Sequence, residues 1–423
     1  MNATRREFLR LGLGSSALLA CGTTVPTFLA NAANLLAAQP AKGDPGNVLV
    51  VVQLDGGNDG LNTVIPFKDD DYKKHRTKLQ QPPAQLHKLD DRLALHSALV
   101  NLAKVNEQKQ LAVVQSVGYP NPNRSHFESM AIWHTAQLKP TAATPGWLAT
   151  ALDRRIASAG GDAPALHIAS GPVPQALYGS QRQVPSLLDL QQFRRRLGVP
   201  EAAGPQEQRA ALDKIAGQTR GSDGSLLQFV ERSTVLTYAS SARLEGLLKD
   251  QKTAGGYPEF YGLARRLKLV AQLIKAGLHT SMYYTQLGGF DTHANQQFTH
   301  ANLLRELDDS VKAFLEDLGK AGEAKRVAVL VFSEFGRRLT ENASGGTDHG
   351  TAAPVLVLGP AVKAGIHGPY PNLQDLDGGG DPKHAIDFRQ VYATVLERWL
   401  ACPADKVLGG KFDHLPFLPE ARA

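Results

Sequence analysis

The chain has 423 residues, of which 42% are hydrophobic, 7% are aromatic and 20% are charged, and its formal net charge is +6. This composition is sufficient for a sizeable buried core in one large domain or two. The basic residues are scattered and no nucleic-acid-binding motif is present, so a nucleic-acid partner is not expected.

The first 32 residues have the pattern of an export signal. A pair of arginines, Arg5 and Arg6, precedes a weakly apolar run from Leu11 to Ala30, and Ala30-Asn31-Ala32 follows as a cleavage sequence. This order indicates a signal peptide, and the paired arginines indicate the twin-arginine route. We therefore predict a periplasmic or secreted protein whose partners include the twin-arginine export machinery.

Two other interpretations of this segment stay open. A membrane anchor would need about 20 predominantly apolar residues, whereas glycines, serines, threonines and Pro26 interrupt the run. We therefore expect no stable membrane span. A lipid anchor at Cys21 is the other alternative, because Leu18-Leu19-Ala20-Cys21 resembles a lipobox.

The rest of the chain has the pattern of one α/β domain. Residues 33–46 are small or polar and are expected to form a linker before a domain that covers 47–423. Unalternating apolar runs predict strands that are buried on both faces, at 48–54, 111–117, 281–287, 327–332 and 354–358. Apolar residues at helical spacing predict helices over 260–278, 303–318 and 388–400, with Asp387 placed to cap the last. Strands that alternate with helices predict a mostly parallel sheet sandwiched by helices, and the polar stretch at about 190–255 predicts a helical insertion.

Polar residues gather where the predicted strands end. In open α/β sheets, ligands bind beyond the carboxyl ends of the strands. Carboxylates and imidazoles are ligands for Zn and Mn, and oxygen ligands also suit Mg and Ca, so the pattern predicts one or two divalent metal ions. Ser125 is the candidate nucleophile, activated by metal. The candidate metal ligands are Asp55, Asp291, His293, Glu334, Asp348 and His349, and the candidate catalytic residues are Ser125, Arg124 and His126.

Each of these assignments has a structural alternative. Asp and Asn occupy turn-rich loops such as 55–60 for local reasons. Glu334 could instead pair with Arg337 or Arg338. Ser125 could simply cap a helix, because Glu128 follows it at the spacing of a capping box.

Five longer motifs carry a resemblance to a known superfamily. The motifs are Gln53–Asn62, Gly118–His126, Leu287–His293, Ser333–Arg337 and Gly346–Gly350. Their order resembles the alkaline phosphatase, sulfatase and phosphoglycerate mutase superfamily, and most closely a bacterial branch of it that is exported by the twin-arginine route. This resemblance implies an alkaline phosphatase-like α/β core over nearly all the mature chain.

The resemblance also implies roles for individual residues. Asp55 is similar in place to a metal-binding aspartate after the first strand, and Ser125 to the nucleophile. Asp291 with His293 resembles a metal-binding pair, and His349 resembles a late histidine ligand. Phe335 departs from the pattern, because it stands where a histidine ligand is expected. Pro120 stands where sulfatases carry the Cys or Ser that they modify, so a sulfatase in the strict sense is not expected.

These observations lead to two hypotheses of different classes. The first is an exported metal-dependent hydrolase of phosphate or sulfate esters, whose substrate is a small anionic ester. Arg124 or Asn58 would steady the anion, since a guanidinium fork matches tetrahedral oxyanions. The alternative is a non-catalytic exported binding or scaffold protein with a degenerate metal site, which Phe335 motivates.

Overall fold

The computed structural model describes residues 46–154, 163–169, 171–180, 184, 186–187 and 253–420. The predicted signal peptide, Cys21, the linker up to residue 45 and nearly all of the predicted helical insertion lie outside the described residues. Within the described ranges, no helix combines the length and the apolar character needed to cross a membrane.

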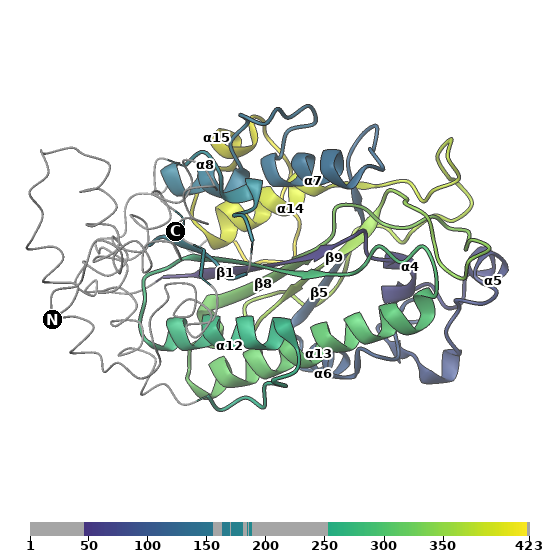
Figure 1. The fold of residues 1–423 in the computed structure, drawn as a ribbon, viewed down its shortest axis with the longest axis horizontal. Coiled ribbons are helices and arrows are strands. Elements are labelled where there is room, and N and C mark those ends of the chain that lie inside the picture. Colours follow the sequence, from purple (N-terminus) through teal and green to yellow (C-terminus); the bar gives the residue numbers. More distant parts are fainter. Residues whose placement is uncertain are drawn as a thin grey trace, which may run out of the picture.

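A mixed, mostly parallel sheet forms the centre of the molecule (Figure 1). Its strand order is β10-β5-β9-β8-β1-β7-β6, and β11 also pairs with β5. Strand β9 runs antiparallel to both of its neighbours, and all other pairs in this sheet are parallel. All five predicted strands are confirmed, with ends within one residue of those expected. The strands are β1 (Val48–Asp55), β5 (Leu111–Gly118), β6 (Ala165–His167), β7 (Met282–Gly288), β8 (Val327–Phe332), β9 (Ala353–Leu358), β10 (Gly365–His367) and β11 (Ile386–Asp387).

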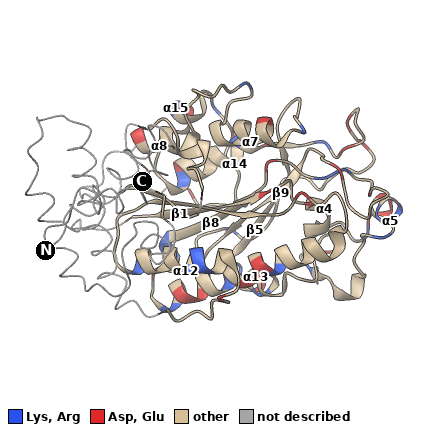
Figure 2. Ribbon diagram, viewed as in Figure 1, with Lys and Arg blue, Asp and Glu red and all other residues tan. Residues whose placement is uncertain are grey.

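Helices cover both faces of the sheet, which confirms the predicted α/β class (Figure 1). One face carries α6 (Val100–Glu107), α12 (Gly262–Lys275) and α13 (Gln296–Lys320). The other carries α7 (His126–Thr135), α8 (Trp147–Arg154), α14 (Phe388–Thr394) and α15 (Ala404–Leu408). Short 3-10 turns occur at η2 (Gln175–Leu177) and η3 (Ala324–Arg326). Figure 2 shows basic and acidic residues interspersed along α12 and α13 rather than segregated by sign.

The predicted helices occur with shifted ends. Helix α13 begins seven residues before the predicted Leu303, and the predicted helix 388–400 is α14 followed by a single π-helical turn, η4 (Val395–Trp399). Asp387 caps α14 as expected: its side chain accepts a hydrogen bond from the Arg389 amide, and the Gln390 side chain completes a capping box.

A small antiparallel sheet that the sequence did not predict lies beside the main one. It contains β2 (Val64–Ile65), β4 (Ala94–Leu95) and β3 (His87–Lys88), in that order. The short helix α4 (Gly60–Thr63) leads from β1 into β2, and α5 (Asp70–His75) and η1 (Pro83–Gln85) connect β2 to β3. Strands of two residues are too short to show a hydrophobic period, so no sequence pattern identifies them.

Strand β1 contributes side chains to the hydrophobic cores on both faces of the sheet. Val48, Val50 and Val52 pack into the core on one face, while Leu49 and Val51 pack into the core on the other. Side chains of a strand alternate between the two faces, so an unalternating apolar run fills both cores at once. The same chain segment therefore anchors its own carboxyl end, Asp55, at a fixed place on the sheet edge.

Asp308 of α13 connects α13 to α6 on the same face of the sheet. Its buried carboxylate accepts hydrogen bonds from the amides of Asn101 (2.9 Å) and Leu102 (2.7 Å), and so caps α6, which has no cap of its own. Asp308→Ala should lower the free energy of unfolding by about 1–2 kcal/mol, as loss of a cap does. Urea denaturation at pH 7.5 measures this. Glu316→Ala, which removes an exposed partner of Lys312 on the same helix, should have an effect below about 0.5 kcal/mol; equal effects of the two changes would contradict the capping role.

Candidate metal centre

The topology of the sheet brings five loops to one edge. Strands β1, β5, β7 and β8 run in one direction, so the residues that follow them lie at the same edge. Strand β9 runs the other way, so the residues that precede it, Asp348 and His349, lie there too. The loop after β8 pairs with the loop before β9 through the Gly350 amide and the Gly336 carbonyl (2.9 Å). Residues that are distant in the sequence thereby become neighbours.

The loop after β7 approaches β1 closely because Gly56 has no side chain. Gly56 has φ +117°, and a Cβ there would lie 2.4 Å from the amide nitrogen of Asp291. Any other residue at this position would push the Asp291 loop away from the sheet edge. The glycine of the Asp-Gly-Gly motif is therefore a requirement of the packing between these two loops.

Asp291 is the centre of the cluster. Its Oδ1 lies 3.1 Å from His293 Nε2 and 3.0 Å from His349 Nε2, and its Oδ2 lies 3.5 Å from His126 Nε2. The two Nε2 atoms of His293 and His349 are 2.9 Å apart. Two ligands of one tetrahedral Zn²⁺ ion, each at about 2.1 Å, are roughly 3.4 Å apart. Ligand atoms of His126, Asp291 and His349 lie within 4.8 Å of one another, so these three side chains can hold one ion.

The other nitrogen of each imidazole is held by a hydrogen-bond partner. His126 Nδ1 lies 2.8 Å from Glu334 Oε1, and His293 Nδ1 lies 3.0 Å from Asp348 Oδ1. His349 Nδ1 lies 2.7 Å from the carbonyl oxygen of Arg124. Partners of this kind fix the tautomer and the orientation of metal-binding histidines. All three rings thus turn Nε2 toward Asp291.

This arrangement changes the roles of two predicted ligands. Glu334 and Asp348 were predicted to bind metal, but here they contact imidazole Nδ1 atoms and orient the rings. Glu334 is fully buried, and its oxygens also accept hydrogen bonds from the Gly56 amide (2.9 Å) and the Ser333 hydroxyl (3.0 Å). Among the described residues it forms no pair with Arg337 or Arg338, so that alternative was wrong. The hydrogen bond from Glu334 raises the pKa of His126.

Arg337 is the member of the site that sequence reasoning did not assign. Its guanidinium is buried and donates hydrogen bonds to the carbonyls of Gly57 (2.6 Å) and Thr347 (2.8 Å) and to Asp291 Oδ1 (2.8 Å). It therefore joins the loops after β1 and β7 to the loop before β9. Partial desolvation opposes ionisation of Asp291, but the hydrogen bonds from Arg337 and His349 prevail and hold the pKa of Asp291 well below its usual range.

The model of a protein family described as "Protein of unknown function (DUF1501)" matches residues 47–405. The chain belongs to the DUF1501 family. A comparison with curated proteins gave no match.

Solved structures with some similarity to this DUF1501 chain come from several bacteria. The C-terminal periplasmic domain of EcEptC from Escherichia coli, in complex with Zn, is 10% identical, with 77% of this chain and 76% of that chain covered and a TM-score of 0.34. Alkaline phosphatase from the Antarctic bacterium TAB5 is 12% identical, with 75% and 92% covered and a TM-score of 0.32. The lipoteichoic acid synthase LtaP from Listeria monocytogenes is 9% identical, with 78% and 70% covered and a TM-score of 0.32. TM-scores below 0.5 are too low for these similarities to support an argument about activity.

Asp55 of the DUF1501 chain lies at the border of the cluster. Its carboxylate is exposed at the end of β1 and accepts a hydrogen bond from Gln53 Nε2 (3.3 Å). The surrounding protein partly desolvates it, and this, together with the nearby charge of Glu334, raises the pKa of Asp55. A cation bound beside it would offset both effects.

The predicted nucleophile is accessible. Ser125 is exposed and occupies the residue before α7, yet its side chain makes no capping hydrogen bond to that helix. The capping-box alternative was therefore wrong. Because His126 follows directly and contacts both Glu334 and Asp291, the Ser125 backbone is held at the edge of the cluster.

The two predicted anion-binding residues are engaged elsewhere. Arg124 Nη2 lies 2.7 Å from Asp377 Oδ2, and Arg124 Nε lies 2.7 Å from Asp381 Oδ2, so two carboxylates already neutralise the guanidinium. The Asn58 side chain is buried, and its oxygen accepts hydrogen bonds from Thr63 Oγ1 (3.0 Å) and His300 Nε2 (2.9 Å). Both predicted anion-binding side chains are thus already engaged with other protein groups, and the backbone carbonyl of Arg124 contacts His349.

Phe335 fills the space beneath two of the imidazoles. Its ring centroid lies 5.0 Å from that of His126 and 4.8 Å from that of His349, and the side chain is buried. A Cβ at Gly57 would lie 2.2 Å from the ring, so the loop after β1 is also packed against it. The apolar Phe335 ring itself offers no ligand to a metal ion.

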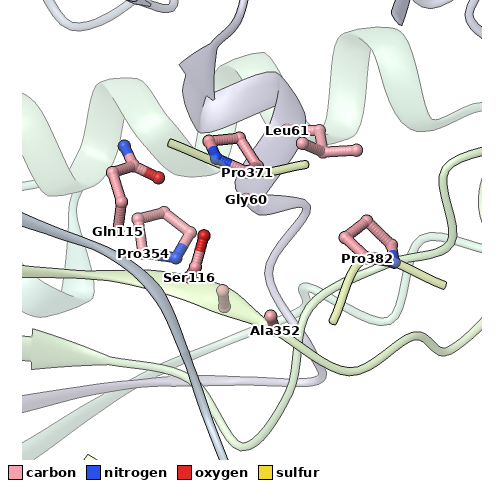
Figure 3. A pocket seen from close by; sticks show the side chains of 9 residues that line it. Gly60, Leu61, Gln115, Ser116, Ala352, Pro354, Pro371 and Pro382 are labelled. Carbon is pink, nitrogen blue, oxygen red and sulfur yellow. The ribbon is translucent and has the colours of Figure 1, made fainter. Parts of the chain in front are cut away.

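The cluster is an open surface feature rather than a deep pocket. The side chains of Asp291, His293 and Asp348 are 47%, 44% and 50% exposed. The small hollow in Figure 3, lined by residues such as Gln115, Ser116 and Pro354, has a volume of about 10 Å³ and can hold roughly one water molecule. A second hollow of about 220 Å³ lies beside the small sheet. Neither is lined by a residue of the cluster.

Proposed function

We propose that this DUF1501 protein is an exported metal-dependent hydrolase of phosphate or sulfate esters. The observation that carries the proposal is the set of three imidazoles that turn Nε2 toward Asp291, each with its Nδ1 held by an acceptor. Imidazole nitrogens favour Zn over Mg or Ca. The proposed ligands are Asp291, His126 and His349, with His293 and Asp55 beside them.

A bound divalent ion would neutralise the anionic ester and lower the pKa of a nucleophile. The residues of the chain would do the rest. The hydrogen bond from Arg337 keeps Asp291 ionised. Glu334 orients the ring of His126, and Asp348 orients the ring of His293. Ser125 offers an accessible hydroxyl for attack. Export through the twin-arginine route, with a lipid anchor at Cys21 as the alternative, is proposed from the N-terminal sequence alone.

The pairing of Arg124 with Asp377 and Asp381 favours a second candidate, a non-catalytic metal-binding protein. With its guanidinium neutralised, Arg124 gives an anionic ester no cationic contact. This candidate predicts bound metal without hydrolysis, which separates it from the first.

The hydrolase proposal is tested with Ser125→Ala. Purified mature protein should contain metal by elemental analysis and should hydrolyse p-nitrophenyl phosphate or p-nitrophenyl sulfate. Ser125→Ala should lower kcat by about a thousandfold or more, as loss of a nucleophile does, with unchanged metal content.

Ser344→Ala, a change at an exposed serine of another loop, is the matched control and should be fully active. Unchanged hydrolysis in Ser125→Ala with metal intact would contradict the serine mechanism. Absence of metal from the wild type after Zn, Mn, Mg and Ca have each been offered would contradict the hydrolase itself.

A further inference from the structure

A buried polar group lies directly beneath Asp55. It consists of Gln53 of β1, His134 of α7 and Tyr284 of β7, whose exposed fractions are 2%, 6% and 1%. Gln53 and Asp55 are two residues apart on β1, so their side chains project from the same face of the sheet. The group therefore connects the core to the border of the cluster.

The hydrogen bonds of this group converge on the oxygen of the Gln53 amide. Gln53 Oε1 lies 2.9 Å from His134 Nε2 and accepts a hydrogen bond from the Tyr284 hydroxyl. His134 Nε2 also lies 3.0 Å from the Tyr284 hydroxyl oxygen. Burial keeps both partners neutral: it lowers the pKa of His134 to about 3 and raises that of Tyr284 well above its ordinary value.

This convergence determines which way the amide points. The Tyr284 hydroxyl donates to one end of the Gln53 amide, and His134 in its Nε2–H tautomer donates to the same atom, so that end is the oxygen. The amide nitrogen is then turned toward the sheet edge, where it donates to Asp55 Oδ1 (3.3 Å). The reverse orientation would place an amide oxygen against a carboxylate oxygen, which is unfavourable. No described residue donates a hydrogen bond to the other oxygen of Asp55, so one oxygen is held and one is available to the cluster.

We propose that Gln53 is a positioning residue that holds the Asp55 carboxylate beside the metal centre, with Tyr284 and His134 fixing the orientation of its amide. The inference rests on the proposed function, because it assumes that the cluster binds a cation. Partners of this outer kind typically change metal affinity by about 10–100-fold when they are removed.

The test compares zinc affinities measured by calorimetric titration of the metal-stripped protein. Gln53→Met, which keeps the length of the side chain but removes the amide, should weaken zinc binding by about 10-fold or more. Tyr284→Phe, which removes one of the two donors to the amide, should weaken it by a smaller factor. Tyr392→Phe is the matched control: it removes a buried tyrosine hydroxyl that donates to the Trp133 carbonyl (3.0 Å), and among the described residues Tyr392 makes no hydrogen bond to Gln53 or Asp55.

A merely structural role for the group would give a different result. Gln53→Met and Tyr284→Phe would then lower Tm, as Tyr392→Phe does, without changing zinc affinity, and the positioning role would be overturned. If Gln53→Met does not fold, the zinc affinity and Tm of Tyr284→Phe are compared with those of Tyr392→Phe in the same way. If the wild type itself binds no zinc or other divalent ion, the proposed function fails, and the positioning role fails with it.

Discussion

Asp291→Asn should leave the protein nearly free of metal and without ester hydrolysis. Asp291 is the only described side chain that contacts all three imidazoles of the cluster, and hydrogen bonds from Arg337 and His349 keep it ionised. An asparagine preserves the size and one hydrogen-bond acceptor for Arg337 but removes the negative charge that attracts a cation. Elemental analysis should give about one ion per chain for the wild type, since the ligand atoms of His126, Asp291 and His349 lie close enough together to hold one ion, and close to none for the variant.

Two further variants make the Asp291 experiment specific. Asp375→Asn, at an exposed aspartate that pairs with Lys383, should keep full metal content. Asp348→Asn should weaken metal binding by about 10-fold without abolishing it, because Asp348 only orients His293. If Asp291→Asn keeps its full metal content, the cluster is not the binding site.

The protein should also lose stability steeply in mild acid. Four of the buried histidines outside the cluster have a lowered pKa: burial lowers the pKa of His96 and His134 to about 3 and that of His167 and His300 to about 4. Below the ordinary histidine pKa of about 6.5, the unfolded chain takes up protons on these groups while the folded chain does not, so stability falls as pH falls. Each group contributes about 1.4 kcal/mol per pH unit below about pH 6.5, so the four together contribute about 5 kcal/mol by pH 5.5.

This loss is large beside a typical total stability of about 5–15 kcal/mol. Asp308 opposes it: burial raises the pKa of this carboxyl to about 6, and its protonation as pH falls from 6 toward 4 favours the folded state. Protonation of this one carboxyl offsets roughly the loss of stability caused by one of the four histidines. Stability should therefore be greatest above pH 7.

Urea denaturation at pH 7.5, 6.5 and 5.5 measures the acid effect. His167→Gln should reduce the dependence on pH by roughly a quarter, because one of four neutral histidines is removed. His414→Gln, at an exposed histidine, is the matched control. A wild-type free energy of unfolding that is the same at pH 5.5 and 7.5 would show that these imidazoles become protonated inside the fold.

The strands of the main sheet were predictable because their signal is local. An unalternating run such as Val48–Leu54 can be satisfied only by burial on both faces. The direction of β9 was not predictable, since a run of apolar residues is the same for either direction. The small sheet was missed for a related reason: its strands are shorter than any period.

Most members of the cluster could be named from the sequence, but the sequence did not show which of them are candidate ligands and which orient the imidazoles. Carboxylates at strand ends suggested ligands, and the residue type alone does not distinguish Asp291 from Glu334, which orients His126. His126 was predicted to be catalytic, whereas its Nε2 lies among the candidate ligand atoms. Arg337 and the Arg124–Asp381 pair depend on contacts between distant segments, and no local pattern reports them.

The antiparallel course of β9 brings together side chains from three distant parts of the chain, which a bound ion would cross-link. His126 follows β5, Asp291 follows β7 and His349 precedes β9, so a single ion bound to them would close two long loops across the width of the sheet. Closing long loops restricts the unfolded chain most, which is the role that disulfides serve in many exported proteins. The described part of this chain has one cysteine, Cys402, and it is buried. An ion at Asp291 would thus cross-link a fold that has no disulfide among its described residues. The Tm of the protein should then rise as the concentration of the ion is increased.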